Sequence, residues 1–130
     1  MYPPRFDYVA PTTVDEVLAV LAERGDEAKV LAGGQSLIPM MKLRLATPEH
    51  LVDLAAISEL RGIRQDGGAI VIGAMTTQQA LIVSDLLATK LPLLRETALV
   101  IADPQVRYVG TLCGNIANGA TAVLYSSEQF

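Results

Sequence analysis

A short apolar segment that runs into two glycines constrains the fold of this chain most. Residues 30–32 (Val-Leu-Ala) have the pattern of a buried strand, and the pair Gly33 and Gly34 is typical of a tight turn. Ser36 then suits the N-cap of a helix that begins at Leu37. The sequence therefore predicts a strand, a turn and a helix in direct succession.

A turn of this kind can hold an anion. Gly33 and Gly34 have no Cβ atoms and permit positive φ, so successive N–H groups can point at a phosphate. A helix that begins at Leu37 adds unpaired N–H groups and the positive end of its dipole. The same pattern is also typical of an ordinary turn between a strand and a helix, so this stretch alone leaves both interpretations open.

Composition excludes several classes of protein. The 130 residues are 51% hydrophobic, which is sufficient for a globular core, and the net charge of -4 without a basic cluster argues against a nucleic-acid surface. Apolar runs are short and are interrupted by charges or proline, so no membrane span is expected. The N-terminus has no apolar stretch of the signal-peptide type, and we expect a cytoplasmic location.

The inventory of reactive side chains is small. Cys113 is the one cysteine and His50 the one histidine, so an intrachain disulfide and a paired-histidine metal motif are both impossible. His50 precedes an apolar run and is predicted to lie in a solvated loop. No Ser-His-Asp set can be assembled, and we predict neither catalytic residues nor a metal site.

The pattern of elements changes after Ile57. Before it, strands at 6–9, 30–32 and 51–54 alternate with helices, one of which begins at the capping box Thr13-Val14-Asp15-Glu16. This alternation predicts a small parallel or mixed sheet built from βα units. We expect this first subdomain to comprise residues 1–57.

Residues 58–130 are predicted to form a second subdomain that begins with antiparallel pairing. Asp66-Gly67-Gly68 lies between two apolar runs and predicts a hairpin. Thr76 or Thr77 is expected to cap a helix, and the apolar stretch 84–102 is expected to supply packing helices. The overall prediction is an α/β (α+β) fold.

A second stretch rich in glycine, amide and hydroxyl groups spans residues 103–119. It can donate many hydrogen bonds, and it is flanked by apolar residues on its N-terminal side. Two such stretches in one small chain suggest two loops that close on one extended phosphorylated ligand, such as a dinucleotide.

The order of these motifs closely resembles the flavin subunit of molybdenum hydroxylases, of the carbon monoxide dehydrogenase and xanthine dehydrogenase type. The resemblance runs from Phe6 to about Gly119. The motifs that carry it are AGGQSLIP at 32–39, MKLRL at 41–45, DPQVR at 103–107, and the pairs Gly110-Thr111 and Gly114-Asn115.

The resemblance implies an FAD-binding fold of the vanillyl-alcohol-oxidase type, with FAD held between two α/β subdomains. By this resemblance one loop grips the FAD pyrophosphate and a second loop adds further contacts. The first loop comprises Ala32, Gly33, Gly34, Gln35, Ser36, Leu37 and Ile38. The second comprises Gly110, Thr111, Gly114 and Asn115.

The resemblance also implies a role and partners. In the family, an iron-sulfur small subunit passes electrons to FAD, and a molybdopterin large subunit hydroxylates the substrate. This chain would then pass electrons to an external acceptor, and the cofactor would supply the redox chemistry.

The chain differs from the family pattern at three places. Cys113 replaces the first glycine of a common Gly-Gly pair, residues 120–125 lack the usual proline and acidic residue, and the sequence stops at Phe130. We therefore expect a truncated chain whose second subdomain is incomplete at its C-terminal end. The alternatives are a non-catalytic remnant or interaction module that does not retain FAD, and a generic nucleotide-binding module.

Overall fold

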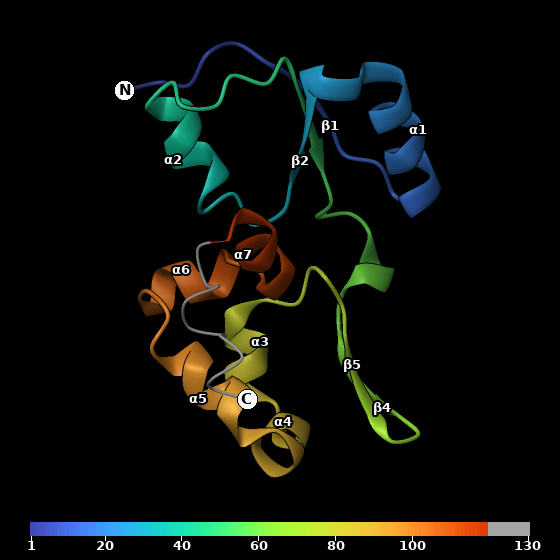
Figure 1. Ribbon diagram of the computed structural model, residues 1–130, viewed down its shortest axis with the longest axis vertical. Helices are drawn as coiled ribbons and strands as arrows, with labels where there is room; N and C mark the ends of the chain where they lie inside the picture. The colour runs from blue at the N-terminus through green and yellow to red at the C-terminus, as the bar shows by residue number, and fades with distance from the viewer. Residues whose placement is uncertain (120–130) are drawn as a thin grey trace. The chain divides into compact units, whose positions relative to one another are not determined.

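The computed structural model describes residues 1–119 of the chain, which divides into two compact units, Met1–Ser58 and Glu59–Phe130 (Figure 1). The first unit carries the parallel sheet. The second carries a hairpin and most of the helices. The α/β fold class predicted from the sequence is confirmed.

The first unit is built around the central strand of a parallel three-stranded sheet. Its strands are β1 (Asp7–Val9), β3 (His50–Asp53) and β2 (Ala28–Leu31), in the order β1-β3-β2. Both outer strands pair with β3 in parallel, so β3 is buried from both sides. Leu51 and Val52 are accordingly 2% and 0% exposed. The predicted small parallel sheet is confirmed.

Helix α1 (Val14–Arg24) connects β1 to β2 through a short 3-10 turn, η1 (Gly25–Glu27). Its N-terminus has the predicted capping box in modified form. The Thr13 hydroxyl accepts from the N–H of Glu16, and the Glu16 carboxylate accepts from the N–H of Thr12. Gly25, with φ 54°, ends the helix.

The prediction that His50 lies in a solvated loop is wrong. His50 begins β3, opposite Asp7 of β1, and its Nδ1 lies 3.7 Å from the Asp7 carboxylate. Towards the other end of the same two strands, the Tyr8 hydroxyl donates to the Asp53 carboxylate at 2.5 Å. This hydrogen bond to a carboxylate raises the pKa of the Tyr8 phenol.

Helix α2 (Leu37–Lys42) follows β2 and packs through one residue in particular. Met41 is 1% exposed, whereas Leu43 and Leu45 are 60% and 72% exposed. Met41 therefore anchors the helix in the core, and the two leucines that follow it do not. The chain leaves the helix through Arg44, which has φ 60°, and this turn points the following leucine away from the interior.

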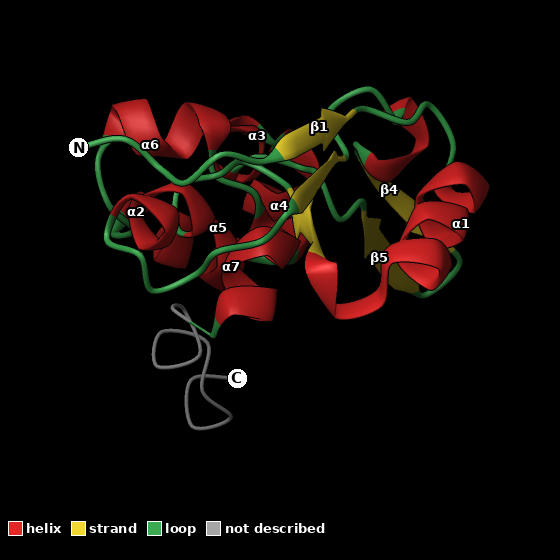
Figure 2. Cartoon of the chain, turned by 90° about the horizontal axis from the view of Figure 1, so that it is seen from above, coloured by secondary structure: helices red, strands yellow, loops and turns green. Residues whose placement is uncertain are grey.

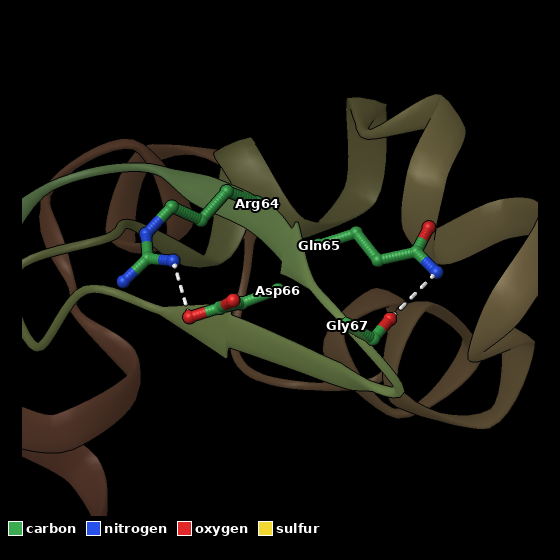
Figure 3. Close-up of polar contacts among 4 residues, drawn as sticks. All are labelled: Arg64, Gln65, Asp66 and Gly67. Carbon is green, nitrogen blue, oxygen red and sulfur yellow. Dashed lines mark hydrogen bonds and ion pairs between the residues drawn. The ribbon is translucent and has the colours of Figure 1, made fainter.

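The second unit begins with a 3-10 turn, η2 (Ser58–Leu60), and the predicted hairpin of β4 (Ile63–Asp66) and β5 (Ala69–Ile72). The strands pair antiparallel across a two-residue turn in which Gly67 has φ 58°. Figure 3 shows that side chains of β4 close the turn: Arg64 contacts Asp66 at 3.2 Å, and the Gln65 amide donates to the carbonyl of Gly67.

Up to Gly119, where the described residues end, five helices follow the hairpin, and Figure 2 labels them. They are α3 (Gln78–Val83), α4 (Asp85–Lys90), α5 (Pro92–Leu99), α6 (Pro104–Val109) and α7 (Leu112–Asn118). The apolar faces of α3, α4, α5 and α7 form one core, made of Leu81, Leu87, Leu94, Ala98 and Leu112, whereas α6 has no buried residue. Within residues 1–119, no helix combines the length and the apolar character that crossing a bilayer requires.

A close backbone approach fixes the hairpin to the segment before it. Gly73 donates to the carbonyl of Gly62 at 2.8 Å, and Met75 donates to the carbonyl of Leu60 at 2.7 Å. A Cβ placed on Gly73 would lie 2.3 Å from the Leu60 carbonyl oxygen. Glycine is therefore required at this position by packing.

We predict that Gly73→Ala lowers the free energy of unfolding by about 1–3 kcal/mol, the usual cost of overpacking, because the backbone of Leu60 must move. Gly68→Ala is the matched control in the same hairpin, since a Cβ there has no heavy atom within 4 Å. Urea unfolding measures both. Equal losses in the two variants would contradict the packing argument.

Candidate functional site

The predicted first loop is the turn between β2 and α2, and its sharpest constraint lies at Gly34. Gly34 has φ 77°, whereas Gly33 is not among the residues with positive φ. The expectation that both glycines supply positive φ is therefore right for Gly34 alone. A Cβ on Gly34 would also lie 2.7 Å from Cδ1 of Ile38. Conformation and packing both favour glycine there.

Backbone N–H groups in this turn have no acceptor in the described part of the chain. From Gly33 to Leu37, no N–H group donates to an acceptor within residues 1–119. The first helical bond after the turn runs from Ile38 to the carbonyl of Gly34, at 3.0 Å. The glycines, Ser36 and Leu37 are half-buried, and Gln35 is exposed. Such a run of N–H groups can donate to anionic oxygens in place of water.

The prediction that Ser36 caps α2 with its side chain is wrong. The helix does begin at Leu37, but Ser36 itself has helical angles, φ -106° and ψ -46°, and its hydroxyl makes no capping bond. Capping needs an extended residue whose side chain can reach forward to the first turn. The Ser36 hydroxyl has no hydrogen-bond partner among the described residues and can therefore bond to a ligand.

The predicted second loop is largely helical. Helices α6 and α7 occupy most of residues 103–119, and each begins at a capping side chain. Asp103 accepts from the N–H of Val106, and Thr111 accepts from the N–H of Gly114. Both helices are so short that the helical spacing of their apolar residues could not be recognised in a stretch this rich in glycine. What remains of the loop is the turn at Gly110 and Thr111.

This turn is fastened to the start of α3. Thr77 and Thr111 form an antiparallel bridge, flanked by a bond from Gln78 to the carbonyl of Gly110 and a bond from Leu112 to the carbonyl of Thr76, both 2.9 Å. Gly110 also donates to the carbonyl of Val106, so both of its backbone groups are used. The predicted contact of Gly110 with a cofactor would therefore be a van der Waals contact and not a backbone hydrogen bond.

Thr111 and the first turn of α7 retain some free donors. The N–H groups of Thr111 and Cys113 donate to no acceptor in the described part of the chain, and the Asn115 side chain makes no hydrogen bond there. Cys113 lies inside α7, where helical angles suit any L-residue. The replacement of a family glycine at this position therefore strains nothing.

The structure groups the predicted residues by loop. Those from Ala32 to Ile38 share one turn of the first unit, and those from Gly110 to Asn115 share one turn of the second. Sequence reasoning missed the contribution of α3, whose residues Thr77 and Gln78 hold the second turn. The capping pattern at Thr77 was visible in the sequence, but nothing there linked it to Gly110.

One further cluster was not foreseen. Ligand atoms of Glu27, Glu49 and His50 lie within 4.8 Å of one another at the start of β3. Both carboxylates are exposed, and exposed acidic groups gather in this way without an ion. The described residues give no reason to assign a metal to them.

The chain belongs to the family described as the FAD binding domain in molybdopterin dehydrogenase, whose model matches residues 4–126. FAD is thus the cofactor of its family. The predicted loss of an acidic contact in residues 120–125 lies outside the described residues.

The chain is similar to the medium chains of two carbon monoxide dehydrogenases. It is 61% identical to that of Afipia carboxidovorans and 58% identical to that of Hydrogenophaga pseudoflava, over 119 residues in each case. The match covers 92% of this chain, but 41% and 42% of those relatives. A crystal structure of the Cu,Mo-CO dehydrogenase matches with a TM-score of 0.90 over 92% of this chain and 42% of the solved chain.

We predict that Gly34→Ala is destabilising by about 1–2 kcal/mol, because the new side chain must adopt positive φ. It also meets Cδ1 of Ile38. Adding Ile38→Val removes that atom, so the double variant should recover part of the loss. A double-mutant cycle in urea measures the coupling. Strictly additive losses would show that Ile38 does not constrain the turn.

Proposed function

We propose that this chain binds FAD as the flavin part of a molybdenum hydroxylase and passes electrons from iron-sulfur clusters to an external acceptor. The observation that carries the proposal is the run of N–H groups from Gly33 to Leu37 that have no acceptor among residues 1–119, in a member of an FAD-binding family. Bound FAD supplies the redox chemistry, and the chain supplies binding and tuning. No general acid or base is required of its side chains.

The first loop is proposed to hold the pyrophosphate through its backbone. Gly34 turns the chain so that the following N–H groups stay outside the helical ladder. The Ser36 hydroxyl is proposed as an added donor, since it has no capping role. Ala32 and Ile38 bound the turn, and the neighbouring Gln35 and Leu37 contribute their N–H groups. The site needs no basic side chain, because charge-assisted bonds from N–H groups are strong.

The second loop is proposed to contact the cofactor through the N–H groups of Thr111 and Cys113 and the Asn115 amide. Gly114 donates to the Thr111 hydroxyl at 3.1 Å, which holds that oxygen in place and leaves its O–H able to donate. Gly110 is proposed to let the cofactor approach closely, because it has no side chain. Rigid attachment to α3 keeps this turn in place before FAD arrives.

The partners are proposed from the relatives. Proteins named as medium chains, such as that of Afipia carboxidovorans, imply other subunits. We propose an iron-sulfur small subunit and a molybdopterin large subunit for this chain. The chain spans about two fifths of the length of these relatives, so it covers part of what a medium chain contains. A cytoplasmic location stays a prediction.

Two other functions compete with this proposal. A remnant or interaction module would keep the fold without retaining FAD, and a generic nucleotide module would bind ADP as tightly as FAD. The absorption spectrum of the purified chain and a competition titration with ADP distinguish the three. Retained flavin absorbance together with weaker binding of ADP favours the flavoprotein.

Our test of the first loop uses Ser36→Ala. Because the Ser36 hydroxyl makes no capping bond, the variant should unfold like the parent chain. If that hydroxyl donates to a phosphate oxygen, FAD affinity should fall by about tenfold or more, the usual cost of a lost hydrogen bond to a charged group. Flavin fluorescence titration measures the affinity.

Ser84→Ala is the matched control. The Ser84 hydroxyl accepts from the N–H of Leu87 and caps α4, so this variant should lose about 1 kcal/mol of stability and keep its FAD affinity. Unchanged FAD affinity in Ser36→Ala would remove Ser36 from the site. A parent chain that binds no FAD would refute the proposed function itself.

Subunit association gives a separate prediction. The tagged chain, expressed with candidate small and large subunits, should recover both of them, because the relatives are parts of larger enzymes. A tagged Gly73→Ala variant, whose second unit is expected to be less stable, shows whether recovery of the two subunits depends on correct packing of that unit. Recovery of neither subunit by the parent chain would contradict the proposed partners.

A further inference from the structure

The side chain of Gln78 is buried without a partner. It is 1% exposed, and neither its Nε2 nor its Oε1 has a hydrogen-bond partner among the described residues. The other large side chains that are fully buried in the described chain are apolar: Met41, Ile57, Leu81, Leu87 and Val52. A buried amide that bonds to nothing costs free energy which an apolar residue of that size would not cost.

The fold satisfies its other buried polar side chains. Thr76 is 3% exposed, and its hydroxyl both accepts from the N–H of Gly62 and donates to its carbonyl. Thr111 is also 3% exposed, and its hydroxyl accepts from Gly114. Gln78 lies beside both threonines along the same bridge, yet its amide is left out. The exception therefore concerns a single side chain and is not a general looseness of packing.

The position of Gln78 connects it to the second candidate loop. Its own N–H donates to the carbonyl of Gly110 at 2.9 Å, and the bridge between Thr77 and Thr111 adjoins it. Gln78 is thus bonded directly to the turn whose free N–H groups are proposed to face the cofactor. A side-chain amide offers two N–H donors and a carbonyl acceptor, which suits a ligand rich in phosphate oxygens and hydroxyl groups.

We propose that Gln78 is a binding residue of the second cofactor loop, whose amide obtains its partners when FAD binds, directly or across one water that arrives with the cofactor. This inference rests on the proposed function. It means that the Gln78 amide lowers the stability of the free chain and strengthens the binding of FAD. Groups kept for function at the expense of stability have this signature.

The sign of two effects tests this proposal. Gln78→Met fills the same space without polar atoms, so the free chain should melt at a higher temperature, by about 4 °C for a domain of this size. The same variant should bind FAD about tenfold more weakly. Thermal unfolding without FAD and fluorescence titration with FAD give the two readouts. Gln78→Leu repeats the test with a differently shaped apolar side chain.

Gln79→Met is the matched control, since Gln79 is the next residue of α3 and is only half-buried. It should change neither the melting temperature nor the FAD affinity. A resident internal water would already satisfy the Gln78 amide, and then Gln78→Met and Gln78→Leu would both lower the melting temperature. That result would overturn the proposal.

The remaining outcomes also decide the matter. Higher stability with unchanged FAD affinity would show that FAD does not supply a partner for the Gln78 amide. This result would overturn the proposal and leave the proposed function intact. A parent chain that binds no FAD would instead refute the proposed function. Weaker FAD binding together with a more stable free chain, absent in Gln79→Met, supports Gln78 as a residue of the site.

Discussion

The obligation of backbone N–H groups to find acceptors governs the first loop. The parallel ladder between β2 and β3 ends with a bond from Leu54 to the carbonyl of Leu31, and the bonds of α2 begin with Ile38 on Gly34. The backbone N–H groups from Gly33 to Leu37 lie between these two points, and they donate to no described acceptor. Water or a ligand can supply the acceptor that the described residues do not. The β2–α2 connection can thus bind an anion without specialised side chains.

The second loop, by contrast, already uses several of its hydrogen-bonding groups within the protein. Gly110 uses both backbone groups within the protein, and the Thr111 hydroxyl is occupied by Gly114. Its donors are few and firmly placed, since the bridge to Thr77 ties the turn to α3. A turn held in this way loses little conformational freedom when a ligand binds, so less of the interaction energy is spent on ordering it. The two loops therefore suit complementary tasks: many donors in one, fixed position in the other.

Local patterns in the sequence predicted the elements well. Thr13 with Glu16, and Asp66-Gly67-Gly68, are signals whose cause lies within a few residues, and both structures form as expected. The failures had distant causes. His50 entered a strand because Asp7 and Ala28 pair with it, and no neighbour in sequence shows that pairing.

The same distinction applies to the site. Gly34 was recognisable because positive φ is a local property, whereas the side chain of Ser36 has no capping role because Ser36 itself has helical backbone angles. Gln78 was not recognisable at all. A glutamine one residue after a capping threonine resembles any exposed first-turn residue, and its burial results from packing against segments more than thirty residues away, such as the turn at Gly110.

Backbone geometry requires glycine at only some of the glycine positions in these motifs. Gly34 needs positive φ and has no room for a Cβ beside Ile38, so glycine is required by the fold itself. Gly114 contributes an N–H to Thr111, which any residue except proline can supply, and Cys113 sits in an ordinary helical position. A glycine in these two places is therefore not demanded by backbone conformation.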